Sequence, residues 1–176
     1  MLYLNCEDIF LGNIIINILN QKKIEIHQDQ RNNYLSQLII KKKNKSIFLE
    51  INEKKTVLEL PTSHEVFFNC IKKLLNNIKI RMKEFDYYPY QQTIIMNHKK
   101  IYLKNIHNQI LLKLVLHIEK GINKELLYQY IWPNEKVISI NKLDSHLTNL
   151  KNLLLSEIGF LLNFNSNNKN IKLIMN

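Results

Sequence analysis

The sequence predicts a chain of two folded parts: an α/β module over residues 1–80 and an α+β domain over residues 91–176. In the first part, short apolar runs alternate with helical patterns, whereas in the second part three helical patterns lie between two hairpin patterns. Residues 81–90 lose clear periodicity and include Pro89, which predicts a linker. Because 45% of the chain is hydrophobic and 9% is aromatic, both parts have the side chains to build a core, and global disorder is excluded.

The first part opens with alternating strands and helices. Asp8 is a suitable N-cap for a largely apolar helix, and the alternation Lys23-Ile-Glu-Ile-His27 is typical of a strand. A weaker helical pattern ends in the run Lys41–Lys43, which we interpret as a solvated end. The predicted elements are a strand over 2–4, a helix over 9–19, a strand over 23–27 and a helix over 30–42.

Two strand-like runs follow, over 47–51 and 56–60, with only four residues between them. Four residues are too few for a parallel crossover, so the two runs predict an antiparallel hairpin. Pro61 ends the second run, and Thr62 with Glu65 then predicts a capping box at the start of a helix. That helix runs over 63–78 and carries Phe67, Ile71, Leu74 and Ile78 on one face.

The second part has a sharper pattern, in which a hairpin is followed by three helices. Gly121 is a natural left-handed stop for the first helix, and Asn123 is the N-cap of the second helix, which Trp132-Pro133 ends. Either Ser139 or Asn141 opens the third helix. The predicted elements are strands over 93–96 and 101–103, a helix over 106–118, a helix from Asn123 to Trp132, a helix through Leu143, Leu147, Leu150 and Leu154, and strands over 160–164 and 170–174. Three helices between β-hairpins are the layout of a winged helix-turn-helix.

Two motifs in this part carry a resemblance to a known family. The second helix contains Glu125-Leu-Leu-Tyr-Gln-Tyr-Ile-Trp132-Pro, an apolar pair followed by an aliphatic residue and Trp, and the third helix contains Leu143-Asp-Ser-His-Leu-Thr-Asn-Leu-Lys151. In order and spacing, both motifs resemble the OmpR/PhoB-type DNA-binding domain of bacterial response regulators, over residues of about 90–174. The Gly-x-Gly-Tyr wing tip of that family is replaced here by Asn165-Ser-Asn-Asn-Lys-Asn170. Asn tolerates the left-handed turn conformation better than most residues do.

The first part resembles a reduced receiver domain of the same two-component family. Cys6-Glu7-Asp8 stands where receivers carry an acidic pair, Glu50 stands at the position of the phosphoacceptor Asp, and Leu60 replaces the Lys of the family's Lys-Pro turn. Aspartyl phosphorylation needs an Asp nucleophile, a Mg²⁺ held by carboxylates, and a Lys that neutralises the phosphoryl charge. The resemblance therefore implies an atypical receiver that has no phosphoacceptor, and Glu7 with Asp8 is better explained as a helix N-terminal cap.

The third helix of the second part offers a candidate DNA-reading face. At about 100° per residue, its leucines fall on one side, and small polar side chains without any acid fall on the opposite side. Asn bonds adenine through two atoms in the major groove, and Ser and Thr bond either base edge. An ordinary solvated face remains the alternative explanation. The candidate DNA-binding residues are Asn141, Lys142, Ser145, His146, Thr148, Asn149, Lys151 and Asn152 in the helix, with Asn168, Lys169 and Lys172 in the wing.

The charge pattern favours an anionic partner. The net charge is +10, and residues 87–176 hold 11 basic and 5 acidic side chains, against 14 and 10 in residues 1–86. A shortage of acids favours binding to a polyanion such as double-stranded DNA, although the same charge also serves solubility. The chain has 25 Asn, 23 Lys against 2 Arg, and no Ala. That bias is typical of an AT-rich genome, so a single Asn or Lys carries little weight.

Nothing in the sequence indicates an enzyme, a cofactor or a metal. The six histidines are scattered without metal-ligand spacing, and a chain with three glycines has no Gly-rich phosphate loop. The apolar runs are far too short for a membrane span, and the N-terminus shows no signal peptide. Cys6 and Cys70 lack CxxC spacing, which is typical of a reduced, cytoplasmic protein.

These observations lead to two hypotheses. The first is a sequence-specific DNA-binding transcriptional regulator of response-regulator type that does not depend on phosphorylation. The second is a non-enzymatic interaction module whose winged helix docks RNA polymerase or another signalling partner. The wide apolar band of the 63–78 helix predicts a homodimer held by the first part, because exposed bands of that width mark interfaces. The alternative is that the band is simply the core of a small three-layer module. The band consists of Val66, Phe67, Phe68, Cys70, Ile71, Leu74, Leu75 and Ile78.

Overall fold

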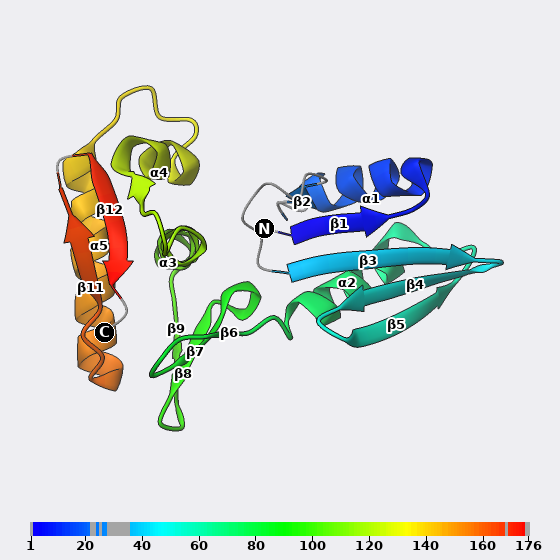
Figure 1. Ribbon diagram of the computed structural model, residues 1–176, viewed down its shortest axis with the longest axis horizontal. Helices are drawn as coiled ribbons and strands as arrows, with labels where there is room; N and C mark the ends of the chain where they lie inside the picture. The colour runs from blue at the N-terminus through cyan, green and yellow to red at the C-terminus, as the bar shows by residue number, and fades with distance from the viewer. Residues whose placement is uncertain (1, 22–23, 25, 28–35, 168, 175–176) are drawn as a thin grey trace. The chain divides into compact units, whose positions relative to one another are not determined.

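The computed structural model of the chain describes residues 2–21, 24, 26–27, 36–167 and 169–174 (Figure 1). The chain divides into two compact units, Met1–Ile78 and Lys79–Asn176. Each unit has its own core and is described by itself. Among the described residues, no helix is both long enough and apolar enough to cross a membrane.

The first unit is built on one five-stranded sheet. Its strands are β1 (Leu2–Cys6), β2 (Ile26–His27), β3 (Ser36–Lys43), β4 (Ser46–Ile51) and β5 (Lys54–Glu59), in the spatial order β2-β1-β3-β4-β5. The strand β1 is parallel to both β2 and β3, whereas β3, β4 and β5 pair antiparallel. The hairpin predicted for 47–51 and 56–60 is therefore confirmed, and the unit is an α/β module with a mixed sheet.

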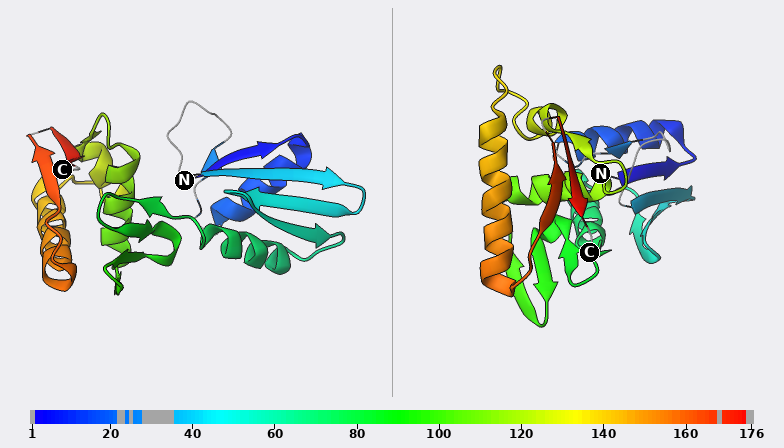
Figure 2. Two further views of the ribbon diagram at one scale, coloured as in Figure 1. Left: turned by 60° about the horizontal axis from the view of Figure 1, so that its bottom comes forward. Right: turned by 60° about the vertical axis from the view of Figure 1, so that its left-hand side comes forward.

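Two helices, α1 (Ile9–Gln21) and α2 (His64–Leu75), cover one side of this sheet. The helix α1 packs on β1 and β2, α2 packs on β4 and β5, and the two helices contact each other (Figures 1 and 2). Asp8 caps α1 as predicted, because the Leu11 N–H donates to Asp8 Oδ1 at 3.0 Å. The cap of α2 is Ser63, whose hydroxyl oxygen accepts from the Val66 N–H at 3.2 Å, so the predicted Thr62–Glu65 capping box is wrong.

The helix predicted for 30–42 is wrong where the structure describes it. Residues Ser36–Lys43 form β3, in which Ser36, Leu38 and Ile40 are buried and the residues between them are half-buried. This period of two is a strand pattern, but the following Lys41–Lys43 run, which is exposed, hides it in the sequence. The remainder of the predicted helix, over 30–35, lies outside the described residues.

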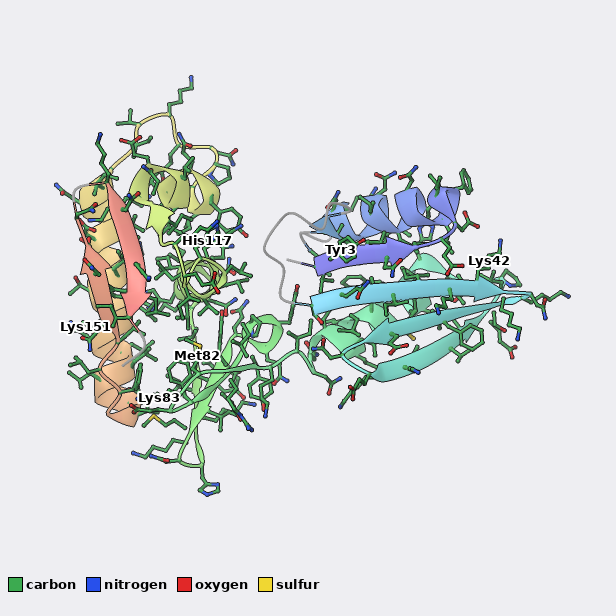
Figure 3. All side chains as sticks on the ribbon, in the orientation of Figure 1. Tyr3, Lys42, Met82, Lys83, His117 and Lys151 are labelled. Carbon is green, nitrogen blue, oxygen red and sulfur yellow. The ribbon has the colours of Figure 1, made fainter. Side chains whose placement is uncertain are left out.

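The second unit begins earlier than the sequence predicts. The strands β6 (Ile80–Arg81) and β7 (Asp86–Tyr88) join β8 (Thr93–Met96) and β9 (Lys99–Tyr102) in an antiparallel sheet of order β6-β7-β8-β9, and a short 3₁₀ helix over Pro89–Gln91 follows β7. Met82, labelled in Figure 3, Phe85 and Tyr87 are buried in the core of this unit. Residues 81–90 therefore belong to this sheet and the short helix after β7, and they are not the predicted linker. The sequence does not reveal the two strands, because each is short and a turn of four residues separates them.

Three helices follow the sheet: α3 (Asn105–Leu116), α4 (Lys124–Ile131) and α5 (Ile140–Ile158). Asn123 caps α4 as predicted, since its Oδ1 accepts from the N–H groups of Glu125 and Leu126 at 2.8 and 3.1 Å. Of the two predicted starts of α5, Ser139 is the N-cap residue. Gly121 has a positive φ of 75°, but α3 already ends at Leu116, so Gly121 closes the turn after the helix.

A three-stranded sheet of order β10-β12-β11 closes the unit. Its strands are β10 (Ile122–Asn123), β11 (Asn163–Ser166) and β12 (Asn170–Ile174), all antiparallel. The strand predicted for 160–164 starts three residues later, at Asn163. Before it begins, the Phe160 ring packs edge-on against the Phe85 ring, with 4.9 Å between the ring centres, and Leu162 is buried in the core. Three helices followed by this hairpin form the predicted winged helix-turn-helix arrangement.

A buried amide ties the sheet of the second unit to α3 and generates a stability prediction. The Tyr87 hydroxyl donates to Asn108 Oδ1 at 2.7 Å, and Asn108 Nδ2 donates to the Pro89 carbonyl at 3.0 Å. Asn108→Ala should lower the free energy of unfolding by about 1–3 kcal/mol, because it removes two buried hydrogen bonds. The Tyr87 hydroxyl then keeps only the backbone carbonyl of residue 108, at 3.0 Å, and the Pro89 carbonyl keeps only the Gln92 N–H, at 3.2 Å.

Urea unfolding followed by the fluorescence of Trp132, the single Trp of the chain, measures that change within the second unit. The matched control is Asn105→Ala at the exposed start of the same helix, expected within about 0.5 kcal/mol of the parent. Equal losses in the two variants would contradict a role for the buried network.

Candidate nucleic-acid interface

The orientation of α5 is set by one buried apolar stripe. Leu143, Leu147, Leu150 and Leu154 are all at most 5% exposed and belong to the core of the second unit. Since side chains three and four residues apart share one side of a helix, burial of this stripe turns the opposite side of α5 to the solvent. That outward face of α5 consists of Asn141, Ser145, Thr148, Asn149 and Asn152, all exposed.

The outward face of α5 presents amides more than hydroxyls. The Ser145 hydroxyl donates to the Asn141 carbonyl at 2.8 Å, and the Thr148 hydroxyl donates to the Asp144 carbonyl at 2.9 Å. Both hydroxyl protons are thus used inside the helix. The side chains that offer both a donor and an acceptor to an outside partner are the amides of Asn141, Asn149 and Asn152. Around Ser145 the face is hollowed into a shallow, open depression.

The acid at the edge of this face is neutralised by a lysine of α4. Lys124 Nζ lies 3.0 Å from Asp144 Oδ1, and only 7% of Lys124 is exposed. This ion pair joins the first turn of α4 to the second turn of α5. It therefore fixes the angle between the two helices and removes a negative charge that would repel a phosphate.

A second carboxylate near the face, Glu135 in the loop between α4 and α5, is paired in the same way. Lys142 Nζ lies 2.5 Å from Glu135 Oε1 and 4.4 Å from the centre of the Trp132 ring. The Tyr128 hydroxyl also donates to Glu135. The hydrogen bonds from Lys142 and Tyr128 lower the pKa of the Glu135 carboxyl. Lys142, predicted as a DNA contact, is therefore already engaged within the domain.

His146 does not share the outward face of α5. Its ring lies 5.4 Å from that of Trp132 and 5.9 Å from that of His107 on α3. The Nδ1 atoms of both histidines are buried and have no hydrogen-bond partner among the described residues. His146, which is half-buried, therefore packs α5 against α3, and its assignment to the DNA-contacting set stays a prediction.

The wing is held against the start of α4. The Lys124 N–H donates to the Lys169 carbonyl at 2.8 Å, and Lys172 Nζ donates to the Glu119 carbonyl at 2.7 Å. Lys172 thus anchors the wing, whereas the side chain of Lys169 is exposed. At the tip, Asn167 Oδ1 accepts from the N–H groups of Lys169 and Asn170 at 3.0 and 2.6 Å, which makes the turn without glycine. The predicted contact Asn168 lies outside the described residues.

Lys151 completes the predicted set. It is half-buried on α5 and is labelled in Figure 3. The pairing partners Lys124 and Glu135 were missed by sequence reasoning, because they lie twenty and seven residues from Asp144 and Lys142 and no local spacing joins them. Only the opposite charges of Lys124 and Asp144 in neighbouring helices give a signal.

Two acidic residues of the first unit are engaged in local contacts. Asp8 caps α1, and the carboxylate of Glu50, near the end of β4, lies 3.6 Å from Lys55 Nζ on the neighbouring strand. Glu7 and Glu50 border one depression over the sheet together with lysines. Within the described ranges of the chain, no group of three or more His, Cys, Asp or Glu could hold a metal ion.

No protein-family model matches this chain, and no curated protein matches it in sequence. Among solved structures it is similar to the DNA-binding domain of E. coli CadC, at 14% identity and a TM-score of 0.47, over 55% of this chain and 91% of that one. It is also similar to the C-terminal domain of the nisin resistance regulator NsrR, a lantibiotic response regulator, at 22% identity and a TM-score of 0.39, over 47% of this chain and 84% of that one. Both similarities are too low to imply a shared function.

The buried histidine of α3 generates a pH prediction. His107 is 8% exposed, and burial, followed by the nearby His146 and Lys104, lowers the pKa of its imidazole. In the unfolded chain the imidazole regains a pKa of about 6.5. The unfolded state therefore takes up the proton first as the pH falls, so the free energy of unfolding should decrease below about pH 6.5.

Urea unfolding, followed by the fluorescence of Trp132 at about pH 7.5 and 5.5, measures this loss of unfolding free energy. In His107→Phe the loss should be smaller, since the ring remains but no longer titrates. His98→Asn, at an exposed turn, is the matched control and should keep the loss of the parent. An unchanged loss in His107→Phe would show that other groups cause it.

Proposed function

We propose that the protein is a DNA-binding transcriptional regulator that inserts α5 into the major groove. The observation that carries this proposal is the outward face of α5, an uncharged row of amides whose neighbouring carboxylates, Asp144 and Glu135, are each paired with a lysine. A merely solvated helix would commonly carry Glu and Lys there. Asn side chains suit base edges, because an amide bonds N6 and N7 of adenine at once.

Two lysines are proposed to bind the phosphate backbone beside that face. Lys151 lies on α5 itself, and the exposed Lys169 lies at the wing, which the Lys124 N–H ties to the start of α4. Phosphate contacts orient a protein on the duplex without reading sequence, whereas base contacts specify the site. We therefore assign positioning to the two lysines and sequence readout to the amides.

Protein docking is the second candidate, and one observation favours it. The loop between α4 and α5 carries Val137, which is 78% exposed, and a large apolar side chain on a loop suits a protein partner such as RNA polymerase. The salt dependence of binding to double-stranded DNA separates the two. When lysines of a protein neutralise DNA phosphates, the logarithm of the binding affinity falls linearly with the logarithm of the salt concentration. A protein-docking module would instead show negligible affinity for DNA.

Replacing two amides of the outward face of α5 tests base readout. In Asn141→Ala with Asn152→Ala, we expect the preference for a site selected from random duplexes to fall by about 1–3 kcal/mol per lost two-atom contact. Competition between the selected site and random duplex measures the preference. Asn69→Ala, an exposed position of α2 in the first unit, is the control and should change nothing. An unchanged preference in the double variant would reject readout by these amides.

We further propose that the regulator is independent of aspartyl phosphorylation. Glu50 stands where the resemblance to receivers would place the acceptor and is paired with Lys55, while Asp8 is used as a helix cap. Leu60 supplies no positive charge for a phosphoryl group.

Acetyl phosphate with Mg²⁺ should therefore leave both the mass and the DNA affinity unchanged. Intact-mass spectrometry and a binding titration on the same sample check this outcome. A gain of one phosphoryl group on an acidic residue of the first 60 positions would contradict it.

A further inference from the structure

The sheet of the first unit has one side that its own helices leave uncovered. Because α1 and α2 pack on the same side, the residues that alternate with the buried ones point the other way. Phe48 and Val57 are 40% and 53% exposed on that side, and Ile39 beside them is half-buried. Phe48 and Val57 are direct cross-strand partners in register, so their side chains form one apolar centre. We call this surface the open sheet face.

Charged side chains of both signs surround this centre. Lys43 and Glu59 lie on β3 and β5, at the two ends of one row across the sheet, with Ser46 between them. In another row Glu50 of β4 is in register with Lys55 of β5, and their charged atoms are 3.6 Å apart. Lys41, Lys42 and Glu7 also lie here and border the depression described above. Four lysines and three glutamates thus sum to +1, on a chain whose net charge is +10.

This mixture of signs indicates the kind of partner. A polyanion would meet three glutamates here, and an acidic or basic protein surface would meet nearly as many repulsive as attractive charges. A twofold-symmetric dimer instead requires a patch that is complementary to itself. With the twofold axis along β4, Phe48 faces its own copy, and Lys43 of each chain faces Glu59 of the other. The same axis sets Val57 opposite Lys41 and brings the two Glu50 side chains together, each beside its own Lys55.

We propose that the open sheet face is the interface of a homodimer. Sheets packed face to face bury their inner side chains in a layer about 10 Å thick, so a second copy would cover Phe48 and Val57 as α1 and α2 cover the other side. The dimer would carry two copies of α5, and linking two binding modules raises the affinity for paired half-sites through effective concentration.

This surface replaces the one predicted from the sequence. The helix α2 was expected to expose a wide apolar band, but Phe67, Ile71, Leu74, Leu75 and Ile78 are at most 5% exposed and form the core of the first unit. Only Val66 of that band is exposed, at 49%. The outer side of α1 exposes Ile9 and Phe10, each at 77%, but carries Asn rather than charges beside them and offers nothing to orient a partner.

The first test compares two valines of the same unit. Sedimentation of the full chain at tens of micromolar should show a dimer. Val57→Lys on the open sheet face should weaken the dimer by more than about tenfold, whereas Val66→Lys, at nearly equal exposure on α2, and Phe10→Lys on α1 should leave it intact. A monomeric parent chain, or dissociation by Val66→Lys or Phe10→Lys but not by Val57→Lys, would overturn the proposal.

The second test does not depend on inserting a charge into the apolar centre. Lys43→Glu places two repulsive Glu–Glu contacts in its own dimer, and Glu59→Lys places two Lys–Lys contacts in its own. Each variant alone should be mainly monomeric, and an equimolar mixture should recover dimers, because both contacts of the mixed pair are then attractive. Recovery of a mixed dimer supports the proposed pairing. Two variants that each dimerise like the parent, or a mixture that stays monomeric, would overturn it.

Discussion

Burial of the leucine stripe of α5 is the constraint on which the rest of the second unit depends. Leu143, Leu147, Leu150 and Leu154 are packed into the core, and each fully buried leucine contributes on the order of 2 kcal/mol. Rotating α5 by even a third of a turn would expose this stripe and bury amides without partners, which is costly. The packing energy therefore decides which side chains face the solvent, and the outward face of α5 is a consequence of the core.

The ion pairs around α5 act on that orientation from outside the core. Lys124 is almost fully buried, so its charge needs the carboxylate of Asp144, and their contact joins α4 to α5. Lys142 joins Glu135 of the preceding loop to α5 in the same manner. Each pair therefore holds the helices in place and also cancels a negative charge beside the outward face of α5. Lys142 and Lys124 thus lower the negative charge next to the outward face of α5.

Regular periodicity predicted much of the fold, and irregular segments did not. The leucines of α5, the Asn123 cap and the hairpin of β4 and β5 were all readable, because each has a strict period or a fixed local hydrogen bond. The strand β3 was misread, because Lys41–Lys43 extend it beyond the buried part, and β7 was missed because it is only three residues long. At the candidate site, the angular position of the amides was predictable. The pairing of Lys142 and the inward packing of His146 were not, since both depend on loops and on α3.

The two units differ in how completely they bury their apolar side chains. In the second unit, helices and sheets on all sides enclose one core that includes Met82, Tyr87 and Leu150. In the first unit, a sheet of five strands has helices on one side, and large apolar side chains remain on the other. Burying Phe48 and Val57 needs a second layer that the described residues of this unit do not supply. Because charges of both signs surround these two side chains, a second copy of the same sheet is the layer that we propose to complete the sandwich.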